Sequence, residues 1–97
     1  MSVKQIIQNQ EGTIVDVRTP AEFQGGHVAG SINIPVNQLT QRIEELKNLK
    51  SPLILCCASG GRSAMAAHLL KQQDIACYDG GSWLSVNYLK NQSVEVL

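Results

Sequence analysis

The sequence contains one cysteine whose neighbours could make its sulfur reactive. The cysteine is Cys57, and the residues that follow it are Ala58, Ser59, Gly60, Gly61 and Arg62. We expect a strand to end at Cys57 and a helix to begin near Arg62, so that free N–H groups of the loop and the helix start surround the sulfur. Lowering a thiol pKa from about 8.5 by about two units requires roughly 2.7 kcal/mol, which several such donors can supply. The pattern predicts Cys57 as a catalytic nucleophile and the five residues after it as a substrate-binding loop.

The other cysteines and the histidines are expected to have structural roles. The chain has three cysteines, an odd number that argues against a disulfide framework and for reduced thiols. Side chains alternate along a strand, so Cys56 should point into the core if Cys57 opens into the loop, and Cys77 should pack within a strand. Cys56 and Cys57 lack the two-residue gap of a zinc pair, and His27 and His68 lie far away in sequence. We therefore expect no bound metal and no cofactor.

Polar and aromatic residues near the loop are also interpreted as structural. Asp16 lies at the end of an expected strand, and a buried carboxylate there requires an ion pair, with Arg62 or Arg18 as the partner. We expect Arg62 to orient the loop and His27 to make a structural hydrogen bond. Packing in the core or at its rim is expected for Phe23, Trp83 and Tyr88.

Hydrophobic spacing and turn residues divide the chain into alternating strands and helices. We expect strands at residues 13–17, 31–34, 53–57 and 75–78. We expect helices at residues 3–7, from Pro20 to the glycines at 25 and 26, and at residues 36–49, 62–73 and 83–89. The alternation predicts an α/β fold with a mainly parallel central sheet of about four to five strands and helices on both faces. We expect residues 1–97 to form a single domain.

Composition and charge exclude several classes of partner. Eight Lys and Arg residues balance eight Asp and Glu residues, and there is no extended basic run to neutralise a phosphate backbone. The apolar runs are too short to span a membrane, and the first residues lack the pattern of a secretory signal. We expect a cytoplasmic monomer with no nucleic-acid and no membrane partner.

The motifs of the chain resemble those of the single-domain rhodanese-like family, in the same order and over nearly the whole length. The matching segments are Asp16–Pro20, Glu22–Phe23, Gly26–Pro35, Cys57–Ser63 and Gly80–Gly81. The resemblance implies an α/β domain and a cysteine that takes a sulfane sulfur from a small-molecule donor such as thiosulfate. It also implies release of that sulfur to cyanide, a thiol or a protein thiol. In that family a six-residue loop beginning at the cysteine is the signature of the sulfurtransferase branch, so a thiosulfate sulfurtransferase with a Cys57 persulfide is expected.

Two positions depart from the family pattern. Many relatives carry a cationic residue directly after the cysteine, where this chain has Ala58. This difference weakens the case for the thiosulfate dianion as the natural donor. The tryptophan that follows the paired glycines comes only two residues after Gly81, at Trp83, so we expect the last helix to pack differently.

Two other functions fit parts of the sequence. A dual-specificity-type phosphatase has a cysteine, five residues and an arginine, and the stretch from Cys56 to Arg62 meets that count. Against it, Leu55 stands where that class has histidine, and a buried Cys56 would lack the exposure of a nucleophile. The second alternative is a non-catalytic binding or regulatory module that keeps the fold without turnover, because fold alone does not settle function.

Overall fold

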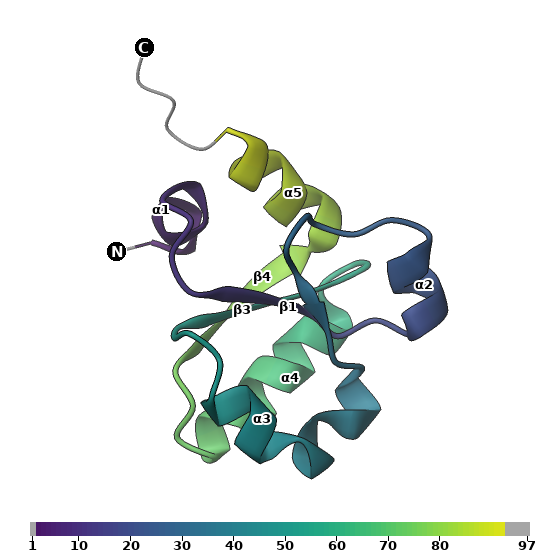
Figure 1. Ribbon diagram of the computed structural model, residues 1–97, viewed down its shortest axis with the longest axis vertical. Helices are drawn as coiled ribbons and strands as arrows, with labels where there is room; N and C mark the ends of the chain where they lie inside the picture. Colours follow the sequence, from purple (N-terminus) through teal and green to yellow (C-terminus); the bar gives the residue numbers. More distant parts are fainter. Residues whose placement is uncertain (1, 93–97) are drawn as a thin grey trace.

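The computed structural model describes residues 2–92, in which helices and strands alternate (Figure 1). The helices are α1 (Val3–Gln8), α2 (Pro20–Gln24), the 3₁₀ helix η1 (Val36–Gln41), α3 (Ile43–Lys47), α4 (Gly61–Gln72) and α5 (Trp83–Asn91). The strands are β1 (Thr13–Asp16), β2 (Ile32–Asn33), β3 (Leu53–Cys57) and β4 (Cys77–Ser82). The predicted domain also includes residues 1 and 93–97, which lie outside the described part. Within residues 2–92, no helix has the length and apolar character needed to cross a bilayer.

The four strands form one open parallel sheet in the order β2-β1-β3-β4, which confirms the predicted α/β fold. Strand β3 is central, and all five of its residues are buried, as expected for a parallel strand covered on both faces. In register, Cys56 lies beside Asp16 of β1, and Cys57 lies beside Ser82 of β4. The carboxyl ends of β1, β3 and β4 therefore meet at one edge, which is where open α/β sheets bind ligands.

The helices bury two apolar clusters, one on each face of the sheet. The odd-numbered residues of β3 pack with α4, η1 and α3. The even-numbered residues of β3 pack with α1 and α5. Figure 1 shows α3 and α4 on one side of the sheet and α1 and α5 on the other. Cys56 and Cys57 thus belong to different clusters, as side-chain alternation predicts.

The amphipathic stretch at residues 36–49 is not the single helix that its spacing predicts. The 3₁₀ helix η1 ends at Gln41, Arg42 leaves helical geometry with φ −121° and ψ 30°, and α3 begins at Ile43. Apolar residues three positions apart share a face in either a 3₁₀ helix or an α-helix. The spacing could therefore indicate a helical face but not the type or continuity of the helix.

The last strand also differs from its predicted range, 75–78, because it runs from Cys77 to Ser82. Ile75 belongs to the end of α4, where the N–H groups of Asp74 and Ile75 bond back to carbonyls of the last helical turn. Asp74 has a φ of 59°, so this ending is a Schellman motif. Residue 75 is therefore apolar because it closes the helix end, not because it starts the strand.

The paired glycines lie inside strand β4 rather than in a turn after it. Leu55 pairs with Asp79 and Cys56 pairs with Gly81, so Gly80 is the extra residue of a β-bulge. A Cβ at Gly80 would lie 2.8 Å from Ile54 Cγ2 and 3.0 Å from the Leu55 carbonyl oxygen. The bulge thus requires a glycine at residue 80, and it carries β4 alongside the end of β3.

Candidate active site at the carboxyl end of strand β3

The sulfur of Cys57 is surrounded by hydrogen-bonding groups of the loop that follows it. The backbone N–H of Gly60 donates to Sγ at 2.9 Å, and the N–H of Ser63 lies 3.4 Å from the same atom. The thiol in turn contacts the Ser63 hydroxyl, with Sγ and Oγ 3.4 Å apart. These groups come from the loop and the first turn of α4, so the strand-to-helix turn brings N–H donors around the sulfur.

The loop depends on one glycine in a left-handed conformation. Gly60 has φ 106° and ψ −16° and immediately precedes α4, a backbone conformation that residues with a side chain rarely adopt. The Gly60 carbonyl accepts from the N–H of Ala64 and from the Ser63 hydroxyl, at 3.0 and 3.1 Å. Ala58, Ser59 and Gly61 are exposed. The loop can therefore aim its N–H groups inward while its outer residues face solvent.

The environment of Cys57 lowers the pKa of its thiol. Burial raises this pKa, but hydrogen bonds from the Ser63 hydroxyl and from the backbone N–H groups of Ser63, Gly60 and Ser59 lower it below its ordinary value. Cys57 is only 1% exposed, whereas reactive cysteines are usually more accessible. The sequence suggested a more open sulfur; it is enclosed because the loop folds back over it.

Arg62 contacts a neighbouring helix instead of the sulfur. Its Nη1 and Nη2 atoms donate to the two carboxylate oxygens of Glu22 on α2, at 2.7 and 3.0 Å. Glu22 also closes the capping box at the start of α2 with Thr19. The Arg62 guanidinium, with the Thr19 N–H, lowers the pKa of Glu22 to about 2. Arg62 therefore ties the loop end of α4 to α2.

The partner of Asp16 is Arg18, which decides between the two arginines considered from the sequence. Arg18 donates through Nε and Nη2 to both oxygens of Asp16, at 2.7 to 3.0 Å, and also to the Gly26 carbonyl at 2.6 Å. The guanidinium carbon lies 4.7 Å from the centre of the Trp83 ring. Both charged residues are buried. This pair therefore fixes the backbone beside the site, and Trp83 covers it.

Of two other residues interpreted as structural, His27 makes the contact that was expected and Tyr88 does not have the expected place. His27 stacks on Phe23 and its Nδ1 lies 2.8 Å from the Phe23 carbonyl oxygen, which is the structural hydrogen bond expected. Tyr88 is 62% exposed, so its predicted place in the core or at its rim is wrong. The buried residue of α5 is Val86.

Asp79 is the residue at this site that sequence reasoning missed. Its Oδ1 accepts from the Ser63 hydroxyl at 2.6 Å and from the N–H of Gly81 at 2.9 Å. Ser63 itself was apparent only as an early residue of the predicted helix. The signal for Asp79 lay in the parallel topology, because β4 runs beside β3 and both strands end at the same edge. The predicted strand ended at residue 78, so Asp79 was left outside it.

Cys56 and Cys77 lie away from this arrangement. Cys56 is fully buried, and burial, with the nearby Asp16 carboxylate, raises its pKa to about 12. Burial also raises the pKa of Cys77, whose sulfur contacts the Ala67 carbonyl at 3.6 Å. A phosphatase-type nucleophile at Cys56 is not favoured by this geometry.

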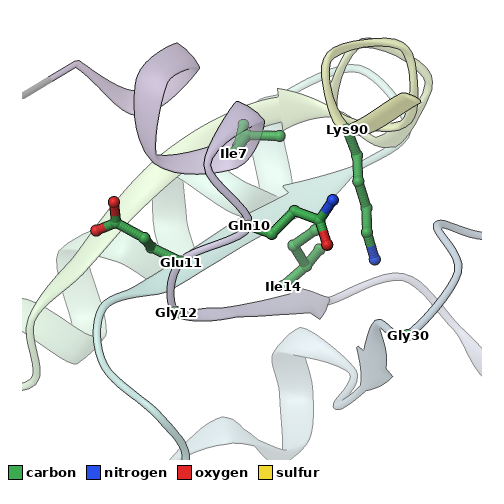
Figure 2. A pocket seen from close by; sticks show the side chains of 7 residues that line it. All are labelled: Ile7, Gln10, Glu11, Gly12, Ile14, Gly30 and Lys90. Carbon is green, nitrogen blue, oxygen red and sulfur yellow. The ribbon is translucent and has the colours of Figure 1, made fainter. Parts of the chain in front are cut away.

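A small cavity of about 120 Å³ lies apart from the Cys57 loop (Figure 2). Its walls come from the end of α1, the start of β1, the turn before β2 and the end of α5. The lining residues are Ile7, Gln10, Glu11, Gly12, Ile14, Gly30 and Lys90. These residues lie near the amino ends of β1 and β2, and none of them belongs to residues 57–63.

The fold and the cysteine loop define the class of protein, and comparison with known sequences identifies the family. Residues 2–83 match the sequence model of the rhodanese-like domain, so the chain belongs to the rhodanese-like family. It is 33% identical over 95 residues to the thiosulfate sulfurtransferase GlpE of Shewanella oneidensis, covering 90% of this chain and 93% of GlpE. It is 43% identical over 63 residues to YqhL of Bacillus subtilis, covering 65% of this chain and 49% of YqhL.

Solved structures agree with this assignment. A rhodanese-related protein from Thermoplasma volcanium superposes with a TM-score of 0.68 at 31% identity, over 88% of this chain and 82% of that one. A rhodanese from E. coli gives a TM-score of 0.68 at 28% identity, over 75% of this chain and 88% of that one. The chain spans about half the length, or less, of some of the curated relatives that it matches, YqhL among them.

Proposed function

We propose that this protein is a sulfurtransferase that carries a sulfane sulfur on Cys57 as a persulfide. The observation that carries the proposal is the pair of backbone N–H groups, from Gly60 and Ser63, that point at the Cys57 sulfur. Such donors stabilise an anionic sulfur, which is both the attacking form of the cysteine and its leaving form. The relatives named thiosulfate sulfurtransferase support the same chemistry at the level of the family.

In the first half-reaction the Cys57 thiolate attacks the outer sulfur of the donor. With thiosulfate, the S–S bond of the donor breaks and its electron pair leaves with sulfite, so Cys57 retains one additional sulfur. In the second half-reaction cyanide or a thiolate attacks that terminal sulfur. The persulfide bond breaks, its electron pair returns to Cys57, and the thiolate is restored. Neither half-reaction requires a dedicated base once the thiolate has formed.

The loop favours some donors over others. Ala58 supplies no charge, and the guanidinium of Arg62 is paired with Glu22, so the dianion of thiosulfate depends mainly on backbone N–H groups. A donor of lower charge, such as an organic persulfide, suits this loop better. The corresponding acceptor is a small thiol or a protein thiol. We also propose that the protein is a monomer in the cytoplasm, because thiols stay reduced in that compartment. We propose no nucleic-acid or membrane partner.

Intact-protein mass spectrometry tests the proposal. After incubation with thiosulfate, or with an organic persulfide in a parallel sample, the wild-type protein should gain the mass of one sulfur atom. Addition of cyanide should remove that sulfur as thiocyanate. The variant Cys57→Ser should gain nothing, and the matched control Cys77→Ser should behave like the wild type. A gain of one sulfur atom by Cys57→Ser, or no gain by the wild type with either donor, would reject the proposal.

A further inference from the structure

A short hydrogen bond joins the side chains of Ser63 and Asp79 beside the Cys57 sulfur. Ser63 Oγ lies 2.6 Å from Asp79 Oδ1, 3.1 Å from the Gly60 carbonyl oxygen and 3.4 Å from Cys57 Sγ. A serine hydroxyl has one proton to donate. Three acceptors therefore surround a single proton when the cysteine is ionised.

The distances indicate which acceptor holds that proton while Cys57 is a neutral thiol. An O–H···O⁻ bond to a carboxylate is charge-assisted, and 2.6 Å is within its usual range. The proton of Ser63 is thus directed at Asp79, and a lone pair of Oγ faces Cys57. The neutral thiol can then donate to Oγ, and the hydroxyl lowers the pKa of Cys57 only when its proton turns from Asp79 to the sulfur. The thiolate gains the Ser63 proton only by competing with Asp79 for it.

We propose that Asp79 is a positioning residue that holds the Ser63 hydroxyl proton away from Cys57, and so makes the thiolate harder to form than it would be if that hydroxyl were free to donate to the sulfur. The proposal rests on the proposed function of Cys57. Asp79 is exposed, but the same Oδ1 also accepts from the N–H of Gly81 at 2.9 Å, within the bulged part of β4, which orients the carboxylate toward Ser63. Its effect is therefore built into the fold.

This arrangement has a chemical consequence for sulfur transfer. Backbone N–H groups increase the thiolate fraction, but the nucleophilicity of a thiolate falls as its pKa falls. A loop with only such donors would hold a thiolate that attacks slowly. The Asp79 carboxylate opposes the N–H groups and keeps the Cys57 sulfur more nucleophilic. Ser63 transmits the effect because it contacts both residues.

The other charged groups around Cys57 do not duplicate this role. Arg62, on α4, favours the thiolate and is neutralised by Glu22 of α2. At the end of β1, the Asp16 carboxylate is paired with Arg18. Each of these charges has an opposite charge beside it, whereas Asp79 is held by a hydroxyl and a backbone N–H.

The test is a titration of Cys57 by the pH dependence of its alkylation with iodoacetamide, with Cys57→Ser as the blank. Asp79→Asn preserves the shape of the side chain but removes its charge, so its hold on the Ser63 proton weakens. We expect the Cys57 titration of this variant to move to lower pH by about 0.5–1 unit. The control Asp74→Asn makes the same change of charge beyond the far end of the 12-residue helix α4, about 18 Å away, and should leave the titration unchanged.

A double-mutant cycle distinguishes an effect of Asp79 that acts through the Ser63 hydroxyl from a direct electrostatic effect of the Asp79 charge on Cys57. In a Ser63→Ala background, Asp79→Asn should shift the titration by less than half as much as it does in the wild type. A purely structural role for Asp79 would loosen the loop and move the titration to higher pH instead. An unchanged or raised titration, an equal shift in both backgrounds, or failure of both Asp79→Asn and Asp79→Ala to fold would overturn the proposal. Alkylation requires no sulfur transfer, so this result is independent of whether the wild type accepts sulfur.

Discussion

Cys56 and Cys57 have the same side chain and adjacent positions, yet their surroundings move their pKa values in opposite directions. Exposure does not separate them, because the two residues are 0% and 1% exposed, and burial raises the pKa of both thiols. At Cys57, hydrogen bonds from the Ser63 hydroxyl and from backbone N–H groups outweigh burial, whereas at Cys56 burial, with the Asp16 carboxylate, raises the pKa to about 12. At the scale of the residue, the direction of each pKa shift follows from the hydrogen-bond donors around the thiol and not from its exposure.

Replacing each cysteine by alanine should separate packing from chemistry. Cys56→Ala and Cys57→Ala each remove one buried sulfur, so each should lower the free energy of unfolding by about 1 kcal/mol in urea titrations. Transfer of sulfur from thiosulfate to cyanide should remain near the wild-type rate in the folded Cys56 variant and be absent in the Cys57 variant. Loss of transfer in Cys56→Ala, with activity kept in Cys57→Ala, would mean that Cys56 and not Cys57 is the nucleophile.

At the scale of the element, the predicted helices and strands were correct where a residue pattern is typical of a single kind of structure. The run of apolar residues at 53–57 fits a buried parallel strand and is one. Helix α2 begins at Pro20 as predicted, with Thr19 and Glu22 forming its capping box. The glycines at 80 and 81 have two meanings, because glycine serves both turns and bulges, and only pairing with β3 decides between them. Asp79 was missed for the same reason, since its contact with Ser63 exists only after that pairing.

Helix α2 illustrates how an element without a core of its own is held. None of its residues is buried, so its attachment depends on polar contacts such as the ion pair of Glu22 with Arg62. Glutamine at residue 22 can still complete the capping box, so Glu22→Gln removes the charge and keeps the cap. We expect the amides of α2 to exchange with deuterium about two- to five-fold faster at pH 7 in this variant.

The ion pair of Glu22 with Arg62 also determines in which direction the free energy of unfolding changes with pH. The folded-state pKa of Glu22 is about 2, against an ordinary 4.5. Its contribution to folding is therefore complete above about pH 4.5 and is lost as the pH falls through about 2.

The matched control for the hydrogen-exchange measurement on Glu22→Gln is Glu44→Gln on α3, an exposed position that should leave the exchange of α2 unchanged. Equal exchange of α2 in wild type and Glu22→Gln would show that other contacts hold this helix.

At the scale of the whole molecule, the two apolar faces share one sheet, and the buried pair of Asp16 and Arg18 lies where several segments meet. Arg18 joins the end of β1 to the Gly26 carbonyl, and Trp83 of α5 packs over it. A domain of this size has a total stability of about 5–15 kcal/mol, so one broken buried pair can remove a large part of it. The exposed pair of Arg42 and Glu45 provides a comparison within the same chain.

Removing each arginine should therefore have very different effects on folding. Arg18→Met leaves the Asp16 carboxylate buried without its partner and should lower the free energy of unfolding by about 3–5 kcal/mol. Arg42→Met removes an exposed partner and should cost less than about 1 kcal/mol. Urea unfolding followed by far-UV circular dichroism measures both changes without relying on Trp83, whose ring contacts Arg18. The double variant Asp16→Asn with Arg18→Met should recover part of the loss, because the unpaired buried charge is then gone. Similar costs for Arg18→Met and Arg42→Met, or no recovery in the double variant, would show that water or another group compensates the Asp16 charge.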